Sequence, residues 1–472
     1  MFSFASKTND PNARLGWNER IGYGIGYFGM ATVNGLMSGF FMKYLTDVSL
    51  YDAAAISTII AVSKLFDGFS DILMGRIVDK THSKLGKARI WLLTMCIPLA
   101  IVSVLLFSTP SGLSGFAKYA YLFIIYNLVN TVFYTAMAVP YNSLIALSST
   151  DPYEHGMMGN IAMIFQTISN IFTNTFFMGW VIKFSGIANL DTPYKPEAQH
   201  GWTMALIVIG IIIVASAVIS VLGTKERTDF AAAKGQEKDN ISTGAALKSL
   251  FTNKYWLMMI LAMFSIFFII VLYSAGAMYY ASDVLGNYAL YTPMNNAISI
   301  AQFAIMFITP FFMKKFGKGL TYWLGLVAIL VGFAGTGIVG ANLPLLIVFN
   351  ALKGLGLGAA GGMAFGMVAD TLEYGEWKTG VRAVGMGNAA ISAAQKLGLG
   401  LGQVALGIIL KAGGYVGGAE TQSESAKAAI SFMYNWLPVI VIAIATFVMF
   451  FYRLDKQLPQ IHEDLTERRK ND

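Results

Sequence analysis

Long apolar stretches, each followed by a short polar segment, recur along the whole chain. A helix needs about 20 apolar residues to cross the hydrocarbon core of a bilayer. The pattern therefore predicts twelve membrane-spanning helices, at residues 22–45, 52–75, 90–109, 117–147, 157–184, 202–223, 255–281, 290–313, 320–340, 343–370, 386–410 and 428–452. The second and eleventh contain full charges, and we expect them to score poorly on hydropathy alone.

The longest polar segment between spans lies halfway along the chain and separates six helices from six. A basic loop with a glycine, Gly86-Lys87 in one half and Gly317-Lys318 in the other, follows the second helix of each half. These features predict an all-α membrane protein with two parallel repeats, the arrangement of the major facilitator superfamily. The expected parts are an N-terminal six-helix bundle (1–223), a central cytoplasmic loop (224–254), a C-terminal six-helix bundle (255–453) and a cytoplasmic tail (454–472).

Composition agrees with a chain that lipid surrounds. Of 472 residues, 56% are hydrophobic and 12% charged, whereas globular domains carry about 25% charged residues. The formal charge of +7 does not indicate nucleic-acid binding, because the basic residues lie in short loops between apolar spans. Cys96 is the single cysteine, so the chain has no internal disulfide.

The basic residues also predict the orientation in the membrane. By the proposed spans, 24 Lys and Arg lie in the two terminal segments and the loops on the same side, against five in the opposite loops. Cytoplasmic loops carry the excess of Lys and Arg. We therefore expect a multi-pass protein of the plasma membrane with both termini in the cytoplasm.

Charges within the spans mark a candidate site, because an ionisable side chain at bilayer depth is costly and is functional by default. Asp67 and Asp71 share one face of the second helix at i and i+4, with Lys64 one turn earlier. Asp67 and Lys396 lie about 13 and 16 Å from the cytoplasmic ends of their helices. An acid pair on one half that meets a lysine on the other could release it when a cation binds.

The bland alternative is a buried Asp–Lys pair that merely orients helices, although it does not explain the second acid. Lys43 lies at the outer end of the first helix, and we expect it to snorkel to the interface. Lys353 has no acidic partner in sequence, and the pattern leaves open that it faces the substrate cavity.

Other classes of membrane protein lack support in the sequence. There is no G-x-x-x-x-G-K-[ST] phosphate loop for ATP-driven transport. The glycine strings at 354–358 and 398–402 lie within apolar spans and indicate close helix packing. No cluster of His, Cys and acidic residues has the spacing of a metal site. We therefore expect neither an enzyme nor a cofactor.

Four motifs, spread over both halves, carry a family resemblance. They are FDGFSDILMGRIVD at 66–79 with KLGKAR at 84–89, VADTLEYGEWKTGVR at 368–382, YGIGYFG at 23–29 and YLTDV at 44–48. Together they resemble the glycoside–pentoside–hexuronide:cation symporter family, the relatives of the melibiose permease. The motifs follow the family's order, so the resemblance covers nearly the whole chain.

The resemblance implies alternating access between two six-helix bundles and transport of a sugar with H⁺ or Na⁺. By position, the cation site comprises Asp67, Asp71, Thr135 and Lys396, where Na⁺ at Asp67 and Asp71 is the one possible metal. Lys396 also lies near the sugar. A cytoplasmic gate is implied around five charged residues: Arg76, Asp79, Asp370, Glu373 and Arg382.

The chain also departs from the family's pattern. Ala31 stands where melibiose-type members have a sugar-binding acid on helix 1, and Ala138 stands where they have the acid of helix 4. One carboxylate fewer favours H⁺ over Na⁺ without deciding between them. Other polar groups at cavity depth are the candidates for sugar contacts: Asn34, Tyr134, Asn142, Gln166, Asn170 and Gln395. Each of these is equally compatible with a role in helix packing.

The predicted function is cation-coupled import of a sugar or glycoside by a monomer in the lipid bilayer. The alternative on the same scaffold is transport of another solute such as a lysolipid or a drug, because a fold does not fix the substrate. A membrane sensor that does not transport would need a signalling domain, and the tail after Arg453 is short.

Overall fold

The described part of the computed structural model is helical throughout. It comprises residues 10, 14–110, 112–187, 193–227, 243–381 and 383–471, and no strand occurs within these ranges. The chain divides into two compact units. Unit 1 comprises residues 1–236 together with 415–422, and unit 2 comprises residues 237–414 and 423–472.

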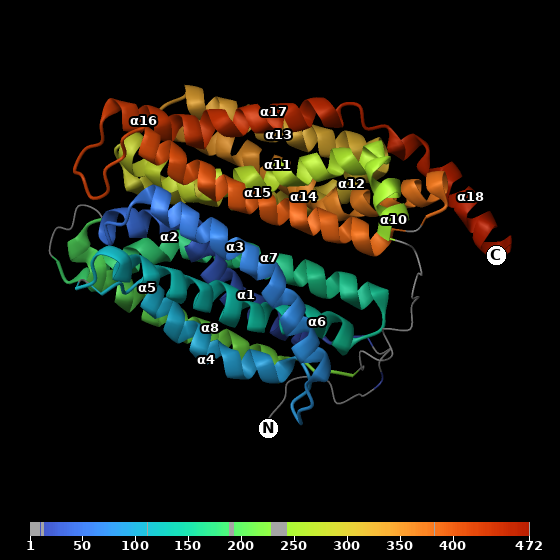
Figure 1. Cartoon of the computed structure of the whole chain (residues 1–472), viewed down its shortest axis with the longest axis horizontal. Coiled ribbons are helices and arrows are strands. Elements are labelled where there is room, and N and C mark those ends of the chain that lie inside the picture. The colour runs from blue at the N-terminus through green and yellow to red at the C-terminus, as the bar shows by residue number, and fades with distance from the viewer. Residues whose placement is uncertain are drawn as a thin grey trace. The chain divides into compact units, whose positions relative to one another are not determined.

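The described helices of unit 1 form six long stretches (Figure 1). They are α1 (Trp17–Gly39) with α2 (Phe41–Lys43) and η1 (Tyr44–Val48); α3 (Ala53–Lys80); α4 (Arg89–Leu106); α5 (Gly115–Asn127) with η2 (Leu128–Tyr134) and α6 (Thr135–Ser148); α7 (Pro152–Ser185); and η3 (Pro196–Ala198) with α8 (Gln199–Gly223). The largest interfaces within the unit join α1 to α7 and α8, and α4 to α8.

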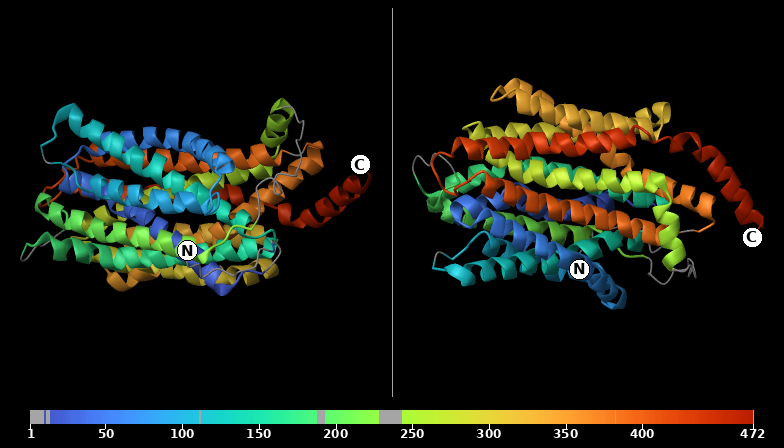
Figure 2. Two further views of the ribbon diagram at one scale, coloured as in Figure 1. Left: turned by 90° about the horizontal axis from the view of Figure 1, so that it is seen from below. Right: turned by 45° about the horizontal axis from the view of Figure 1, so that its top comes forward.

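The described helices of unit 2 also form six long stretches (Figure 2). They are α11 (Lys254–Tyr279) with η4 (Tyr280–Val284); η5 (Tyr288–Leu290) with α12 (Tyr291–Phe316); α13 (Lys318–Ile338); α14 (Leu343–Thr379); α15 (Val384–Ala412); and α16 (Glu424–Ser431) with η6 (Phe432–Trp436) and α17 (Leu437–Met449). The short helix α10 (Thr243–Phe251) lies within the segment predicted as a loop. The 3₁₀ turn η7 (Leu454–Lys456) and α18 (Leu458–Asn471) occupy the predicted tail.

These twelve stretches coincide with the twelve predicted spans, which confirms the all-α membrane fold. Ten of them are long and apolar enough to cross a membrane by length and composition. The helices α3 and α15 are among the ten, and they have the lowest mean hydropathy of the ten, as their charges led us to expect. The other two are α1 and α7, which carry the amides of Asn34, Gln166 and Asn170 in place of apolar side chains.

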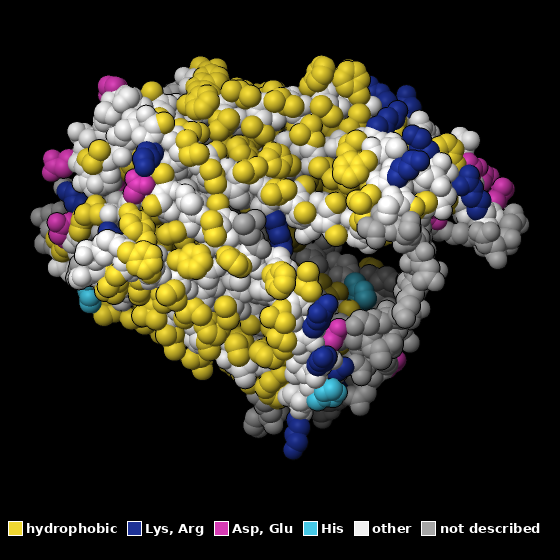
Figure 3. Space-filling model, viewed as in Figure 1, with side chains coloured by type: hydrophobic (Ala, Val, Ile, Leu, Met, Phe, Trp, Pro, Cys, Tyr) yellow, Lys and Arg dark blue, Asp and Glu magenta, His cyan; other side chains and the backbone are white. Residues whose placement is uncertain are grey.

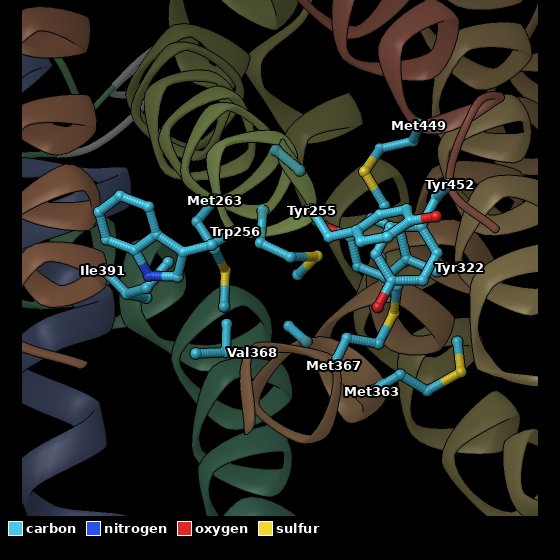
Figure 4. Close-up of a cluster of buried hydrophobic side chains, with 14 of the residues drawn as sticks. Tyr255, Trp256, Met263, Tyr322, Met363, Met367, Val368, Ile391, Met449 and Tyr452 are labelled. Atoms are coloured by element: carbon cyan, nitrogen blue, oxygen red, sulfur yellow. The ribbon is translucent and has the colours of Figure 1, made fainter. Parts of the chain in front are cut away.

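Apolar packing holds each unit together, and apolar side chains also cover its flanks. In unit 2, Tyr255, Tyr322 and Tyr452 gather with several methionines in a buried cluster (Figure 4). The Tyr255 and Tyr452 rings lie 5.2 Å apart, edge to face. On the face shown in Figure 3, hydrophobic side chains cover the middle of the helices, and most charged side chains lie towards the helix ends. This distribution is typical of helices that lipid surrounds.

A carboxylate caps the third long stretch of each unit at corresponding positions. In unit 1, Glu226 follows α8 and accepts hydrogen bonds from the backbone N–H groups of Lys87, Ala88 and Arg89 at 2.6–3.0 Å. In unit 2, Asp455 follows α17 and accepts one from Gly319 at 2.7 Å. Each carboxylate satisfies donors that the start of a helix leaves free.

The loops before these caps also correspond. Gly86 has φ +112° and Gly317 has φ +82°, and an L-residue rarely adopts either value. A Cβ at Gly86 would collide with the carboxylate of Glu226. The equivalent caps and glycines support the predicted internal repeat. So do two π-helical segments of similar sequence, YLTDV at the end of the first stretch of unit 1 and YASDV at the end of the first stretch of unit 2.

Candidate functional site

The carboxylate of Asp67 lies within unit 1, where α3 packs against the helix formed by α5, η2 and α6. Its Oδ2 accepts hydrogen bonds from Lys64 Nζ at 2.9 Å and from Asn130 Nδ2 at 3.1 Å. Its Oδ1 accepts one from the Thr131 hydroxyl at 2.8 Å. The Asp67 and Lys64 side chains are 14% and 24% exposed. Three donors therefore stabilise one largely buried carboxylate.

Asp71 lies one turn further along the same face of α3. The hydroxyl of Thr135 donates to its Oδ1 at 3.3 Å. Ser70 links the two acids, because its hydroxyl donates to the backbone oxygen of Asp67 at 2.9 Å and lies 3.5 Å from the hydroxyl oxygen of Thr135. Asp67, Asp71 and Thr135, which the sequence proposed for one site, thus lie together.

The polar contacts between the two helices repeat at every turn. Asn127 donates to the hydroxyl of Ser63 at 2.8 Å, Thr131 to Asp67, and Thr135 to Asp71. The residues involved are four apart on both helices, so they form one polar stripe between apolar flanks. We call this arrangement the α3–η2 stripe, defined by Ser63, Asp67, Asp71, Asn127, Thr131 and Thr135.

Asn130 and Thr131 were missed as site residues in the sequence. The signal for Thr131 was present, since Asn127, Thr131 and Thr135 recur every four residues in an otherwise apolar span. Asn130 lies outside this period and reaches Asp67 from η2, which is π-helical. A π-helical turn rotates side chains relative to an α-helix and often occurs at functional sites, but period-based reasoning does not detect it.

The stripe also has the chemistry to hold a proton or a hard cation. Carboxylates and hydroxyls are oxygen ligands of the kind that Na⁺-type cations prefer, and a carboxylate can carry a proton. Within the described ranges no group of three or more His, Cys, Asp and Glu side chains could hold a metal ion. A bound Na⁺ would therefore depend on the two acids and neutral oxygens, as the sequence proposed.

Lys396 and Gln395 lie on α15 of unit 2 and are half-buried. The amide nitrogen of Gln395 is 3.8 Å from the sulfur of Met263. The expected pairing of Lys396 with Asp67 and Asp71 would join the two units and stays a prediction. Within unit 1, Lys64 already forms an ion pair with Asp67.

The candidate substrate residues of unit 1 are not equally accessible. Asn34 on α1 and Asn142 on α6 are exposed, whereas Tyr134, Gln166 and Asn170 are partly buried. The amide oxygen of Asn170 lies 3.4 Å from the position that a Cβ of Gly35 would take, so it faces α1 next to Asn34. The Asn170 amide on α7 therefore packs against α1 at Gly35.

Ala31, which departs from the family's sugar site, lies in the interior of unit 1. Ala31 is 4% exposed, in the packing of α1. An acid at position 31 would therefore be buried in this conformation, and the alanine is compatible with its surroundings.

Two residues of the predicted cytoplasmic gate, Asp370 and Glu373, contact basic side chains within unit 2. Lys318 Nζ lies 2.7 Å from Asp370, and His462 Nε2 lies 2.6 Å from Glu373. In unit 1, Arg76 is exposed and Asp79 is half-buried. Arg382 lies outside the described residues. Lys318 and His462 were not foreseen as partners in the sequence.

Lys43 differs from its prediction. It does not snorkel: its side chain is 2% exposed, and its Nζ lies 3.1 Å from Asp47 Oδ2. Lys353 does not face a cavity either. It is fully buried in unit 2, with its Nζ 4.3 and 4.6 Å from the ring centres of Phe333 and Tyr434.

Comparisons with known proteins agree with this architecture. Residues 22–456 match the MFS/sugar transport protein family. The chain is 30% identical over 454 residues to the isoprimeverose transporter of Lactiplantibacillus pentosus, covering 96% of this chain and 92% of that one. It is 27% identical to the glucuronide carrier protein homolog of Escherichia coli K12, covering 97% of both chains.

Solved structures share the fold at low sequence identity. A D-xylose-proton symporter superposes with a TM-score of 0.63 at 13% identity, covering 94% of this chain and 99% of the other. The nucleoside transporter NupG gives a TM-score of 0.61 at 17% identity, covering 92% of this chain and 100% of the other. These likenesses concern the fold alone.

Proposed function

Because the chain belongs to the MFS/sugar transport protein family, we propose that it is a secondary active transporter that carries a sugar or glycoside into the cell together with a cation. The observation that carries this proposal is the α3–η2 stripe. It holds two carboxylates at membrane depth, where an uncompensated charge is costly. The relatives named as an isoprimeverose transporter and a glucuronide carrier support a carbohydrate as the substrate.

We further propose that the coupling ion is a proton. Oδ2 of Asp67 already accepts from Lys64 Nζ at 2.9 Å and from Asn130 at 3.1 Å, and Oδ1 accepts from Thr131. A Na⁺ at Asp67 would have to displace Lys64 and turn the Asn130 amide, whereas a proton needs one free oxygen lone pair. Ala138 supplies no further carboxylate. The alternative ion is Na⁺ bound at Asp67 and Asp71.

The proposed sugar contacts are the polar side chains that line α1, α6, α7, η2 and α15. They are Asn34, Tyr134, Asn142, Gln166, Asn170, Gln395 and Lys396. In this scheme Lys396 pairs with Asp67 or Asp71 during part of the cycle, and the charged residues Arg76, Asp79, Asp370, Glu373 and Arg382 close the cytoplasmic side when the outside is open. The protein works as a monomer in the plasma membrane, with both termini in the cytoplasm.

The experiment is uptake into proteoliposomes of a panel of labelled pentosides, hexosides and hexuronides. An inward H⁺ gradient, with the outside more acidic, and an inward Na⁺ gradient are imposed separately at matched membrane potential. We expect accumulation of at least one glycoside with the pH gradient and none with Na⁺ alone. Accumulation with Na⁺ alone would replace H⁺ as the proposed ion.

A second candidate is transport of a non-sugar solute such as a lysolipid or drug. The observation that favours it is that position 31 of α1 holds a buried alanine and no acid. The same proteoliposomes test it, because it predicts no accumulation of any glycoside under either gradient but transport of an amphipathic solute.

A further inference from the structure

A buried ion pair lies just after the C-terminal end of α1. Lys43 ends α2, and Asp47 lies one turn further on, in η1. Their side chains are 2% and 4% exposed, and Nζ lies 3.1 Å from Oδ2. The attraction within a buried pair offsets the loss of hydration only when further hydrogen bonds satisfy both groups.

The Thr46 hydroxyl donates to Oδ2 of Asp47 at 3.0 Å, and the other hydrogen bonds come from a segment that is distant in sequence, Tyr415–Gln422. The hydroxyl of Tyr415 lies 2.7 and 2.8 Å from the two carboxylate oxygens of Asp47 and donates to this carboxylate. The backbone N–H of Gly418 donates to Oδ1 of Asp47 at 2.9 Å. Lys43 Nζ donates to the oxygen of Tyr415 at 2.8 Å. The segment therefore completes the polar contacts of both charges.

The segment also fits its place in shape. The Gln422 side chain accepts from the N–H of Val416 at 3.1 Å and donates to its carbonyl oxygen at 2.7 Å, which closes the segment into a compact loop. Gly417 packs so closely on the carbonyl oxygen of Thr46 that a Cβ would collide with it. Gly418 has φ +73°, which glycine adopts without strain.

The position of Tyr415–Gln422 in the chain couples its contact with Asp47 to movements of unit 2. Tyr415–Gln422 connects α15 to α16, which belong to unit 2, yet the segment itself belongs to unit 1. Alternating access moves one six-helix bundle against the other. The segment must therefore stretch or leave Asp47 during such a movement.

We propose that Lys43, Asp47 and Tyr415 form a latch, which holds the transporter closed at this end and opens once in each transport cycle. They act as positioning residues and do not bind the substrate. The inference rests on the proposed function, and in the proposed orientation the latch lies on the outer side of the membrane.

The test measures how readily a residue beneath the segment becomes accessible from outside the cell. In a background with Cys96→Ser, a single reporter cysteine is placed by Thr46→Cys, at a residue that is 1% exposed beneath the segment. This change also removes the Thr46 hydroxyl that donates to Asp47, so every latch variant is compared with the Cys96→Ser, Thr46→Cys protein. Its labelling by a membrane-impermeant thiol reagent is followed in whole cells. Tyr415→Phe removes one hydroxyl from the latch, and we expect labelling to accelerate by about tenfold, the factor for one lost hydrogen bond to a charged group.

Two further variants separate a latch from a local defect. Tyr121→Phe removes a hydroxyl from the same unit, one that donates to the Leu105 carbonyl oxygen, and should leave labelling unchanged. Gly417→Ala keeps every charge but displaces the segment, and should accelerate labelling as Tyr415→Phe does. Equal labelling of Tyr415→Phe, Gly417→Ala and the parent would overturn the latch. Because labelling needs no sugar, faster labelling without glycoside transport would support the latch and contradict only the proposed substrate.

Discussion

The side chain of Lys353 packs on the ring of Phe333, with Nζ 4.3 Å from the ring centre. Tyr434 covers the same nitrogen at 4.6 Å, and Gly332 makes room for the stem, because a Cβ there would lie 2.6 Å from Lys353 Cγ. The nitrogen is buried and has no hydrogen-bond acceptor among the described residues. Its surroundings are aromatic and aliphatic, so the side chain is held by packing against the two rings.

This environment predicts that methionine can replace Lys353. The thioether has a similar length and removes a buried nitrogen without an acceptor, so we expect Lys353→Met to change the free energy of unfolding by less than about 1 kcal/mol or to raise it. Lys353→Ala should cost about 2–5 kcal/mol, because it opens a cavity. Thermal unfolding in detergent measures both. Loss of uptake in a stably folded Lys353→Met protein would assign the lysine a role in transport instead.

Neutralising Asp67 should uncouple transport. One charge that moves down a potential of 100 mV supplies about 2.3 kcal/mol, which is about a fifty-fold accumulation ratio. We expect Asp67→Asn and Asp71→Asn each to abolish this accumulation in proteoliposomes. Asp52→Asn is the matched control, because Asp52 caps the same helix at its exposed start and should retain accumulation. Full concentrative uptake by both site variants would refute the assignment of the cation site.

Lys64 should decide which ion the site accepts. Its Nζ occupies Oδ2 of Asp67 at 2.9 Å, and two unit charges about 4 Å apart interact by about 4 kcal/mol at an effective dielectric constant near 20. Removing this charge leaves the two acids free to attract a metal cation. We expect Lys64→Met to make uptake respond to Na⁺ by at least about tenfold, measured in buffers that exchange Na⁺ for choline. Lys118→Met, which removes an amine that bonds backbone oxygens at 2.8 and 2.9 Å, should leave the response unchanged.

The helices could be predicted from the sequence because the apolar period and the length of each span carry that information. Asp67, Asp71 and Thr135 could be grouped for the same reason, since helical spacing places side chains on a face. Asn130 could not, because it reaches Asp67 from a π-helical segment. Lys43 was misassigned for a different reason: its hydrogen-bond partner Tyr415 is 372 residues away, and local hydropathy carries no information about a loop so distant.

The two helix caps yield a prediction about stability that is independent of transport. The carboxylate of Glu226 accepts from three backbone N–H groups at the start of α4, so we expect Glu226→Gln to lower the free energy of unfolding by about 1–2 kcal/mol. Asp455→Asn removes the charge from a cap with a single N–H donor, and its effect should be smaller. Glu424→Gln is the control, because the Glu424 side chain is 89% exposed in its ion pair with Lys427. Thermal unfolding of the three purified variants should therefore rank Glu226→Gln as the least stable; an equal melting temperature for Glu226→Gln and Glu424→Gln would show that the cap contributes little.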